Sequence, residues 1–301
     1  MPLNRRQFLK HSVTTTAGAV ALASATGTAA ASDVPLLSTR DHFDDDANLV
    51  SGEGTFSYDT SGGVPGVDTG CVGDVTVFAH GWDKKSGDDD AEQGAHDKIS
   101  LAESQLTANG YGGTVVGYTW DSDKGGGIDY GWGTAKEIAQ QNGAKLAQFA
   151  VDFKQQCPNA QLRFVCHSLG AQVVLSALRS LDASSWWNDQ GHDVYSTHFL
   201  GAAQDNEAPT TEWMDTYDAI SNQTTAAFNY HSHDDDVLSW VYNTIEFDQA
   251  LGETGYESGN TPAPNYVEND VTSEVGTDHS GYLDNVSGDV VAHMSNVPSY
   301  V

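Results

Sequence analysis

Residues 162–171 read LRFVCHSLGA, and this stretch predicts more of the fold than any other part of the chain. The apolar run that opens it is typical of a buried strand. The following residues, 169–181, predict a helix packed on a sheet, because their apolar side chains recur at helical spacing. A serine at a sharp turn between such a strand and helix is lifted above the sheet, beside free N–H groups. Ser168 is therefore a candidate nucleophile; the alternative is a buried serine that caps the helix.

The sequence around this turn alternates between strand-like and helix-like segments, which predicts an α/β fold with a mostly parallel sheet. Thr134 and Glu137 have the spacing of a capping box ahead of an apolar helical face, so we expect a long helix to begin there. The expected strands are 75–79, 114–119, 162–166, 195–200 and 226–230.

Small residues stand two positions before and two positions after Ser168, namely Cys166 and Gly170. The stretch resembles the elbow of the α/β-hydrolase superfamily, near lipases and esterases that read G-H-S-L-G, although Cys166 departs from the usual glycine. The resemblance covers about residues 74–282. It implies helices on both faces of the sheet and a triad in the chain order Ser, acid, His. Because the segment 204–225 is short, we expect no large cap domain.

Two backbone N–H groups are candidates for an oxyanion hole. An apolar strand ends in His80-Gly81-Trp82, and the resemblance places one donor on Trp82. The second donor maps to Leu169, directly after the nucleophile. His80 precedes the serine in the chain, so we expect it to brace the oxyanion loop rather than act as the base.

The resemblance requires a histidine after the acid. The candidates are His231, His233, His279 and His293. His279 begins the sequence His-Ser-Gly-Tyr in a glycine-flanked loop, which is similar to the histidine loops of the family. We therefore expect His279 to be the base.

The acid has several candidates. In the resemblance, an aspartate two residues before a Val-Leu pair maps to Asp235, and Asp234 or Asp236 could serve if the loop differs by one residue. A different branch of the family, which includes the pancreatic-type lipases, takes its acid from the preceding strand, and this maps to Asp205. We expect the acid to be Asp235.

His231 and His233 alternate along a strand that continues into carboxylates, which is a possible metal-binding pattern. Similar acidic triplets occur at 44–46 and 88–90, where they are typical of a solvated surface. We therefore expect no metal and no cofactor.

The chain has three cysteines. Cys166 is the small residue of the elbow and should be buried. The resemblance makes the strands that follow Cys71 and Cys157 parallel neighbours, so a disulfide between these two is one expectation and two free thiols are the other.

The composition is strongly acidic, with 13 Lys+Arg against 42 Asp+Glu and a formal net charge of −29. Such a surface repels phosphate backbones and anionic lipids, so we do not expect nucleic-acid binding. It predicts a halophilic protein, because concentrated salt screens the self-repulsion. The alternative is an ordinary acidic secreted protein.

The N-terminal residues 1–31 resemble a twin-arginine export signal. Arg5 and Arg6 precede a weakly apolar stretch, 17–23, and an alanine run, 29–31. We expect the twin-arginine translocase as a partner, a secreted mature chain and no integral membrane segment in that chain. After the signal we expect an acidic Gly/Ser-rich segment, 32–70, in which 56–58 could be a short edge strand, and then a hydrolase domain, 71–301.

The resemblance implies a serine hydrolase of carboxylic esters, similar to esterases and lipases. Trp82, Trp120 and Trp132 follow strand ends and could form an apolar wall for a small neutral ester or lipid substrate. The loops 125–133 and 246–278 are candidate covers. The alternatives are an amidase, peptidase or acyltransferase with the same triad, or a catalytically silent binding protein on the same scaffold.

Overall fold

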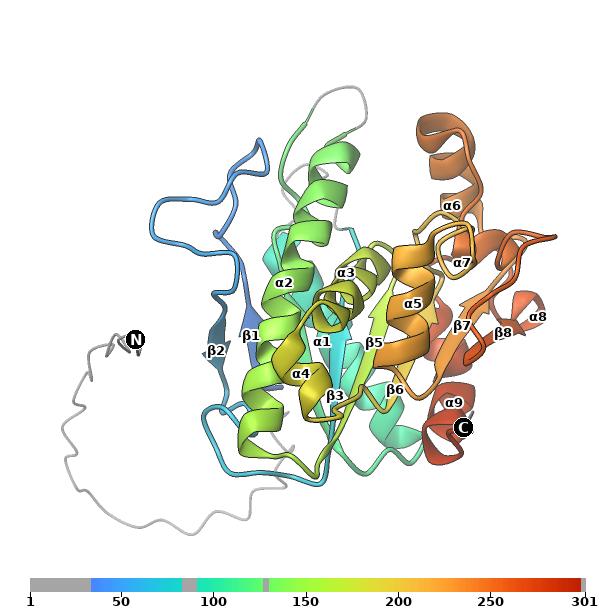
Figure 1. Cartoon of the computed structure of the whole chain (residues 1–301). Coiled ribbons are helices and arrows are strands. Elements are labelled where there is room, and N and C mark those ends of the chain that lie inside the picture. The colour runs from blue at the N-terminus through green and yellow to red at the C-terminus, as the bar shows by residue number, and fades with distance from the viewer. Residues whose placement is uncertain (1–33, 83–90, 127–129, 299–301) are drawn as a thin grey trace, which may run out of the picture. The chain divides into compact units, whose positions relative to one another are not determined.

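The computed structural model describes residues 34–82, 91–126 and 130–298. Within these residues the chain forms an eight-stranded sheet in the order β2-β1-β4-β3-β5-β6-β7-β8 (Figure 1). The strands pair in parallel except β1 with β2, which are antiparallel. The bounds are β1 Leu36–Ser38, β2 Asp59–Ser61, β3 Asp74–Ala79, β4 Thr114–Thr119, β5 Gln161–His167, β6 Ser196–Leu200, β7 Ala227–His231 and β8 Tyr266–Asp270.

The five strands expected from the sequence are the five central strands, β3 to β7, each within one residue of its predicted ends. They are buried almost throughout, which explains why each reads as an apolar run. This confirms the expected fold class.

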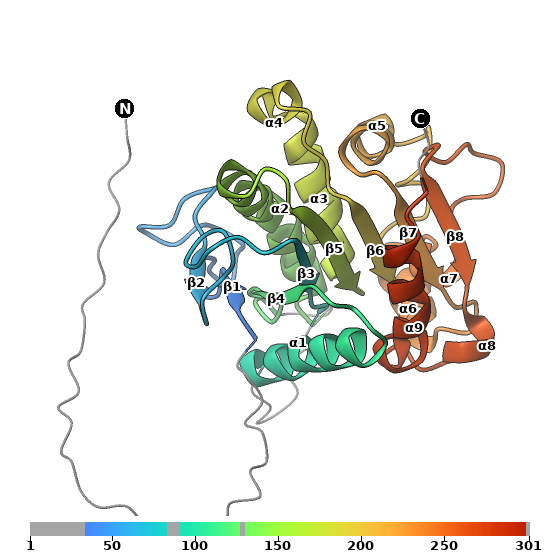
Figure 2. The ribbon, with the colours of Figure 1, turned by 90° about the horizontal axis from the view of Figure 1, so that it is seen from below.

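Helices cover both faces of the sheet (Figure 2). One face carries α2 Trp132–Gln156, α3 Gly170–Asp182 and α5 Met214–Gln223, and the other carries α1 Ala91–Ala108 and α9 Tyr282–Ser295. Each face has its own apolar core cluster. The shorter helices are α4 Ser185–Asp189, α6 Asp236–Val241, the π-helix η1 Tyr242–Glu246, α7 Leu251–Thr254 and α8 Thr272–Val275. In the described residues, no helix combines the length and the apolar composition that a membrane crossing requires.

The start of α2 differs from the prediction. The helix begins at Trp132, directly after Gly131, whose φ is 88°. Thr134 therefore lies inside the first turn, and the capping box expected from Thr134 and Glu137 is wrong. The helix thus begins two residues before Thr134, and the side chain of its first residue, Trp132, is buried in the core.

Residues 34–70 of the expected N-terminal segment lie in the same compact unit as the rest of the described chain. Its strand β1 pairs with β4, and Leu37 and Phe43 are buried in the core. The possible edge strand at 56–58 is not formed; β2 begins one residue later, at Asp59. The export signal expected at 1–31 lies outside the described residues.

The loop 246–278 is not the free cover that we expected. It holds α7, and it contributes β8, the edge strand of the sheet. Residues 127–129 of the other candidate cover lie outside the described residues. The segment 204–225 carries α5, which packs on α3.

A disulfide joins Cys71 and Cys157, whose Cα atoms are 5.6 Å apart. The two residues precede β3 and β5, which are parallel neighbours. This confirms the disulfide hypothesis and excludes the two free thiols. Cys166 is free and buried.

Candidate active site

Ser168 lies between β5 and α3 with a left-handed backbone, at φ 54°. A non-glycine residue in this region is strained and persists only where its surroundings hold it. Here the Ser168 N–H donates to the carbonyl of Leu200, and the Ser168 carbonyl accepts from Ala203. The neighbouring strand β6 and the loop after it thus hold the strained turn in place.

Gly170 and Gly81 explain why the turn requires small residues. A Cβ on Gly170 would lie 2.4 Å from the Ala79 carbonyl oxygen, and a Cβ on Gly81 would lie 2.7 Å from Cβ of Ser168. The end of β3 therefore packs directly against the elbow. Cys166 is fully buried at the other small position, and burial raises the pKa of its thiol well above the usual value. Its side chain fills space without offering a reactive thiolate.

A pocket of about 250 Å³ opens at this turn. It brings together Ser168, His279 and Trp82, which the sequence analysis assigned to one site. Trp132 also lines it, whereas Trp120 does not: its ring is buried and stacks on His80, with 5.5 Å between centroids. The remaining lining residues are His80, Gly81, Gly94, Ala95, Lys98, His167, Val237, Leu238, Val241 and Ser280.

His279 is hydrogen-bonded to Asp235, with 2.7 Å between Nδ1 and Oδ2. The Asp235 side chain is completely buried and caps α6, because Oδ1 accepts from the N–H groups of Val237 and Leu238. One carboxylate oxygen is thus used to hold the helix and the other faces the imidazole. The first turn of α6 therefore fixes the Asp235 carboxylate, and the carboxylate in turn orients the His279 ring.

The other acid candidates lie elsewhere. Asp234 and Asp236 are exposed on either side of Asp235. Asp205 interacts with the charges of Lys136 and Glu246, and burial raises the pKa of its carboxyl.

The other histidine candidates have different partners as well. His231 lies 3.4 Å from the carboxylate of Glu268, and His293 is hydrogen-bonded to the hydroxyl of Tyr230. Of the four histidines, His279 is the one that shares a pocket with Ser168.

Two neighbours of this pair were not expected from the sequence. The Tyr282 hydroxyl is 3.2 Å from Oδ2 of Asp235, and Nε2 of His167 is 2.7 Å from the His279 carbonyl oxygen. Burial lowers the pKa of His167 well below its usual value, so the neutral ring donates this hydrogen bond. Both residues lie in motifs that the sequence analysis used, but only the fold brings them to His279 and Asp235.

His80 holds the loop that follows β3. The Trp120 N–H donates to Nε2 of His80, and Nδ1 lies 2.8 Å from the Gly81 carbonyl oxygen. Burial lowers the pKa of His80 to about 3, so the ring is neutral and its Nδ1–H donates to Gly81. In a trans peptide the C=O and the next N–H point in opposite directions. The bond from His80 therefore directs the Trp82 N–H away from His80.

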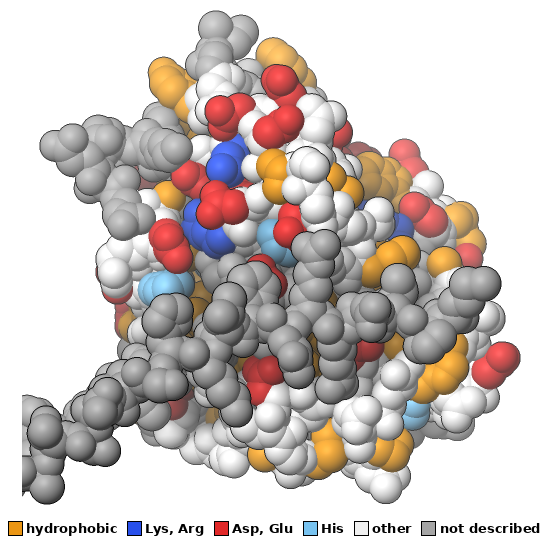
Figure 3. All heavy atoms as spheres, turned by 90° about the vertical axis from the view of Figure 1, so that its left-hand side faces the viewer, with side chains coloured by type: hydrophobic (Ala, Val, Ile, Leu, Met, Phe, Trp, Pro, Cys, Tyr) orange, Lys and Arg blue, Asp and Glu red, His pale blue; other side chains and the backbone are white. Residues whose placement is uncertain are grey.

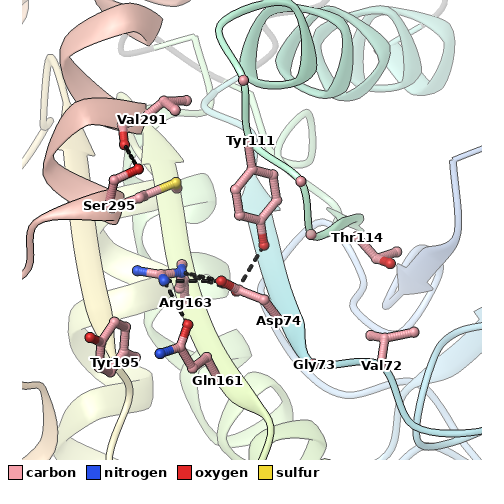
Figure 4. Close-up of a pocket in the computed structure, with 14 residues that line it drawn as sticks. Val72, Gly73, Asp74, Tyr111, Thr114, Gln161, Arg163, Tyr195, Val291 and Ser295 are labelled. Atoms are coloured by element: carbon pink, nitrogen blue, oxygen red, sulfur yellow. Dashed lines mark hydrogen bonds and ion pairs between the residues drawn. The ribbon is translucent and has the colours of Figure 1, made fainter.

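A second and larger cavity, of about 620 Å³, lies at the other end of the sheet, where β3, β4 and β5 begin (Figure 4). Arg163 and Tyr111 both point to the carboxylate of Asp74, at 2.9 Å each. The charges in this cavity are already paired within the chain, and we find no nucleophile with an adjacent base among its lining residues. The pocket at Ser168 is therefore the better candidate for an active site.

The chain resembles solved structures of acetylxylan esterases. Two of them, one titled an acetylxylan esterase and the other the catalytic core domain of acetyl xylan esterase from Trichoderma reesei, are 15% and 13% identical to it. The alignments cover 74% of this chain and 97% and 98% of those chains, with TM-scores of 0.39 and 0.41. No curated protein sequence matches the chain.

A family model described as "Alpha/beta hydrolase of unknown function (DUF900)" matches residues 67–241. The match spans more than half of the chain and includes the loop of Gly81 and Trp82, the elbow and Asp235. The chain belongs to this family of α/β-hydrolases.

Proposed function

We propose that the protein is a secreted serine hydrolase of neutral carboxylic esters. The observation that carries this proposal is the buried 2.7 Å contact between His279 and Asp235, because His279 lines the same pocket as Ser168. A nucleophile on a strained elbow, a base and a buried orienting carboxylate are the parts that acyl transfer requires.

In the proposed reaction, His279 takes the hydroxyl proton as Ser168 Oγ bonds to the acyl carbon. The Trp82 and Leu169 N–H groups stabilise the negative charge that develops on the carbonyl oxygen. When the C–O bond to the leaving group breaks, His279 returns its proton to the departing alcohol. A water molecule, deprotonated by His279, then bonds to the acyl carbon; as the bond to Ser168 Oγ breaks, His279 returns the proton to Oγ and the acid leaves.

The pocket favours a modest, uncharged acyl group. Its side walls include Trp82, Trp132, Val237 and Leu238, and its volume is about 250 Å³, at the small end for ligand pockets. Acidic side chains are dispersed over the exposed surface, as the face in Figure 3 shows, so an anionic substrate would be repelled at low salt. These features support short or medium esters, lipid esters included.

Export through the twin-arginine translocase is part of the proposal. It rests on the paired arginines and weakly apolar stretch at the N-terminus, and on the Cys71–Cys157 disulfide, which is typical of oxidising compartments.

A chain-length series of p-nitrophenyl esters in molar salt tests the proposal. We expect hydrolysis by the wild type, highest for short and medium acyl chains, and its loss in Ser168→Ala. Ser180→Ala is the matched control, because Ser180 lies on α3, the helix that follows Ser168, and its hydroxyl bonds within that helix. Equal hydrolysis by Ser168→Ala and the wild type would overturn the proposal.

A further inference from the structure

Three metal-ligating side chains gather at the carboxyl ends of β7 and β8, outside the pocket of Ser168. His231 and Asp270 are the last residues of the two strands and pair in register. His233 follows two residues after His231, and the two rings are 5.0 Å apart. Nε2 of His233 lies 3.9 Å from Oδ2 of Asp270. Residues 39 positions apart in the chain thus meet at one edge of the sheet.

The arrangement has nearly the dimensions of a metal site. One ligand atom from each of His231, His233 and Asp270 lies within 4.8 Å of the other two. Ligands of a tetrahedral zinc ion, at 2.0–2.1 Å from the metal, are roughly 3.4 Å apart. More than half of the His233 and Asp270 side-chain surface is exposed, so the His233 ring has room to rotate by the remaining distance. His231, which is buried, would be the fixed ligand.

The surroundings of His231 favour a cation. Its Nε2 lies 3.4 Å from Oε2 of Glu268, while its Nδ1 is buried and has no hydrogen-bond partner among the described residues. If Nε2 carries the proton and faces Glu268, Nδ1 keeps a lone pair that accepts no hydrogen bond from the described residues. Glu268 is itself fixed by Asn229 and by the Tyr256 N–H. In metal sites, the ring nitrogen of a ligating histidine that does not bind the metal usually donates its N–H to an acceptor such as a carboxylate.

The Asp270 carboxylate is also held by hydrogen bonds from a neighbouring residue. Its Oδ1 accepts hydrogen bonds from the N–H and hydroxyl of Thr272, at 3.0 and 2.6 Å. These bonds orient the group so that Oδ2 is on the side of His233. The carboxylate is therefore held by Oδ1 while Oδ2 faces the proposed site.

The sequence alone favours no metal here, but the placement of Asp270 beside the two histidines changes this interpretation. We propose that His231, His233 and Asp270 bind a transition-metal dication of the Zn²⁺ type, with water at the remaining positions. Two imidazoles and one carboxylate suit zinc, whereas calcium and magnesium prefer oxygen ligands alone. The ion would tie the end of β7 to the end of β8. Because His233 precedes Asp235 by two residues, it would also anchor the loop that leads to the buried carboxylate. The role is structural, and it does not depend on the proposed esterase activity.

Titration calorimetry with Zn²⁺ on chelator-treated, tag-free full-length protein in molar NaCl tests the site. We expect one saturable equivalent in the wild type and a higher midpoint of thermal unfolding with zinc. His233→Ala and Asp270→Asn, both at exposed positions, should weaken binding at least tenfold and remove the thermal shift. Asp46→Asn is the matched control, since it removes an exposed carboxylate elsewhere, and it should bind as the wild type does.

Ser168→Ala should bind zinc as tightly as the wild type, which separates this test from the test of the hydrolase. A thousandfold excess of Mg²⁺ should not displace the zinc. Weak, unsaturable binding by the wild type would mean that zinc associates only with the acidic surface, and it would overturn the proposal. Unchanged affinity in both His233→Ala and Asp270→Asn would overturn it as well.

Discussion

Nδ1 of His279 lies 2.7 Å from Oδ2 of Asp235, although the two residues are 44 positions apart in the chain. Asp235 is fixed by its role as the cap of α6, and His279 is fixed by the bond between His167 and the His279 backbone. The two ends of the contact are therefore held by different elements. The fold alone therefore sets the orientation of the imidazole, which the proposed role of His279 as general base requires.

Asp235→Asn should lower kcat for ester hydrolysis by about 10³–10⁴-fold, because the amide would favour the wrong imidazole tautomer. KM should change little. Steady-state kinetics in molar salt measures both constants. Asp234→Asn, Asp236→Asn and Asp205→Asn are the controls, and each should keep activity within a few-fold of the wild type. A larger loss in Asp205→Asn than in Asp235→Asn would assign the acid to the other strand.

Tyr282→Phe should lower kcat by about tenfold while the protein stays folded, because it removes a hydroxyl that lies 3.2 Å from both the Asp235 carboxylate and the Gly252 carbonyl oxygen. The pH dependence of kcat should shift as well, since the hydroxyl favours the charged carboxylate that stabilises the imidazolium. Tyr118→Phe is the control, because its hydroxyl bonds to Asn142 in the core. It should reduce thermal stability without changing the pH profile. An unchanged kcat and pH profile in Tyr282→Phe would show that the hydroxyl is only a packing element.

Replacing both Cys71 and Cys157 by serine should lower the free energy of unfolding by about 2–5 kcal/mol, because the disulfide closes a long loop, with 86 positions between the cysteines. Denaturant unfolding of the variant and the wild type, with and without reductant, measures the effect. Reductant should destabilise the wild type and leave the variant unchanged. If the stability of the wild type equals that of the variant and does not change with reductant, the bridge does not form in the protein as purified.

Stability should fall as the pH drops from 7 to 5.5, above the range in which most carboxylates titrate. Burial lowers the pKa of His80 to about 3, and it lowers the pKa of His167 and His198 well below the usual value. In this window the unfolded chain binds protons on these histidines and the folded chain does not, so protonation favours unfolding. Each should contribute on the order of 1 kcal/mol. Urea unfolding at the two pH values checks this, and a stability that rises toward pH 5.5 would contradict it.

The central sheet could be predicted because its strands are buried on both faces and read as apolar runs. The outer strands could not. Only one residue of β8, Tyr266, is buried, and β1 and β2 have three residues each, so their pairing depends on neighbours far along the chain. Helix α1 carries only Ile99 and Leu106 as large buried residues, too few for a clear helical stripe.

The site was predictable to the level of motifs. The elbow and the loops of His80 and His279 each have a local pattern, but the choice among Asp234, Asp235 and Asp236 depends on which of three adjacent side chains turns inward. The cap of α6 decides this, and a cap is a property of the folded backbone. The contacts of His167 and Tyr282 depend in the same way on tertiary placement. The requirement for salt, the export signal and the roles of the site residues stay predictions.

Covalent labelling with a fluorophosphonate probe in molar salt tests the central claim most directly, because the probe reacts with an activated serine whatever the natural substrate. We expect the folded wild type to incorporate one equivalent, with the adduct on the peptide that contains Ser168. Ser168→Ala should not be labelled, and Asp235→Asn should be labelled much more slowly. A folded wild-type protein that is not labelled, or a Ser168→Ala variant that is labelled as fast as the wild type, would contradict the account.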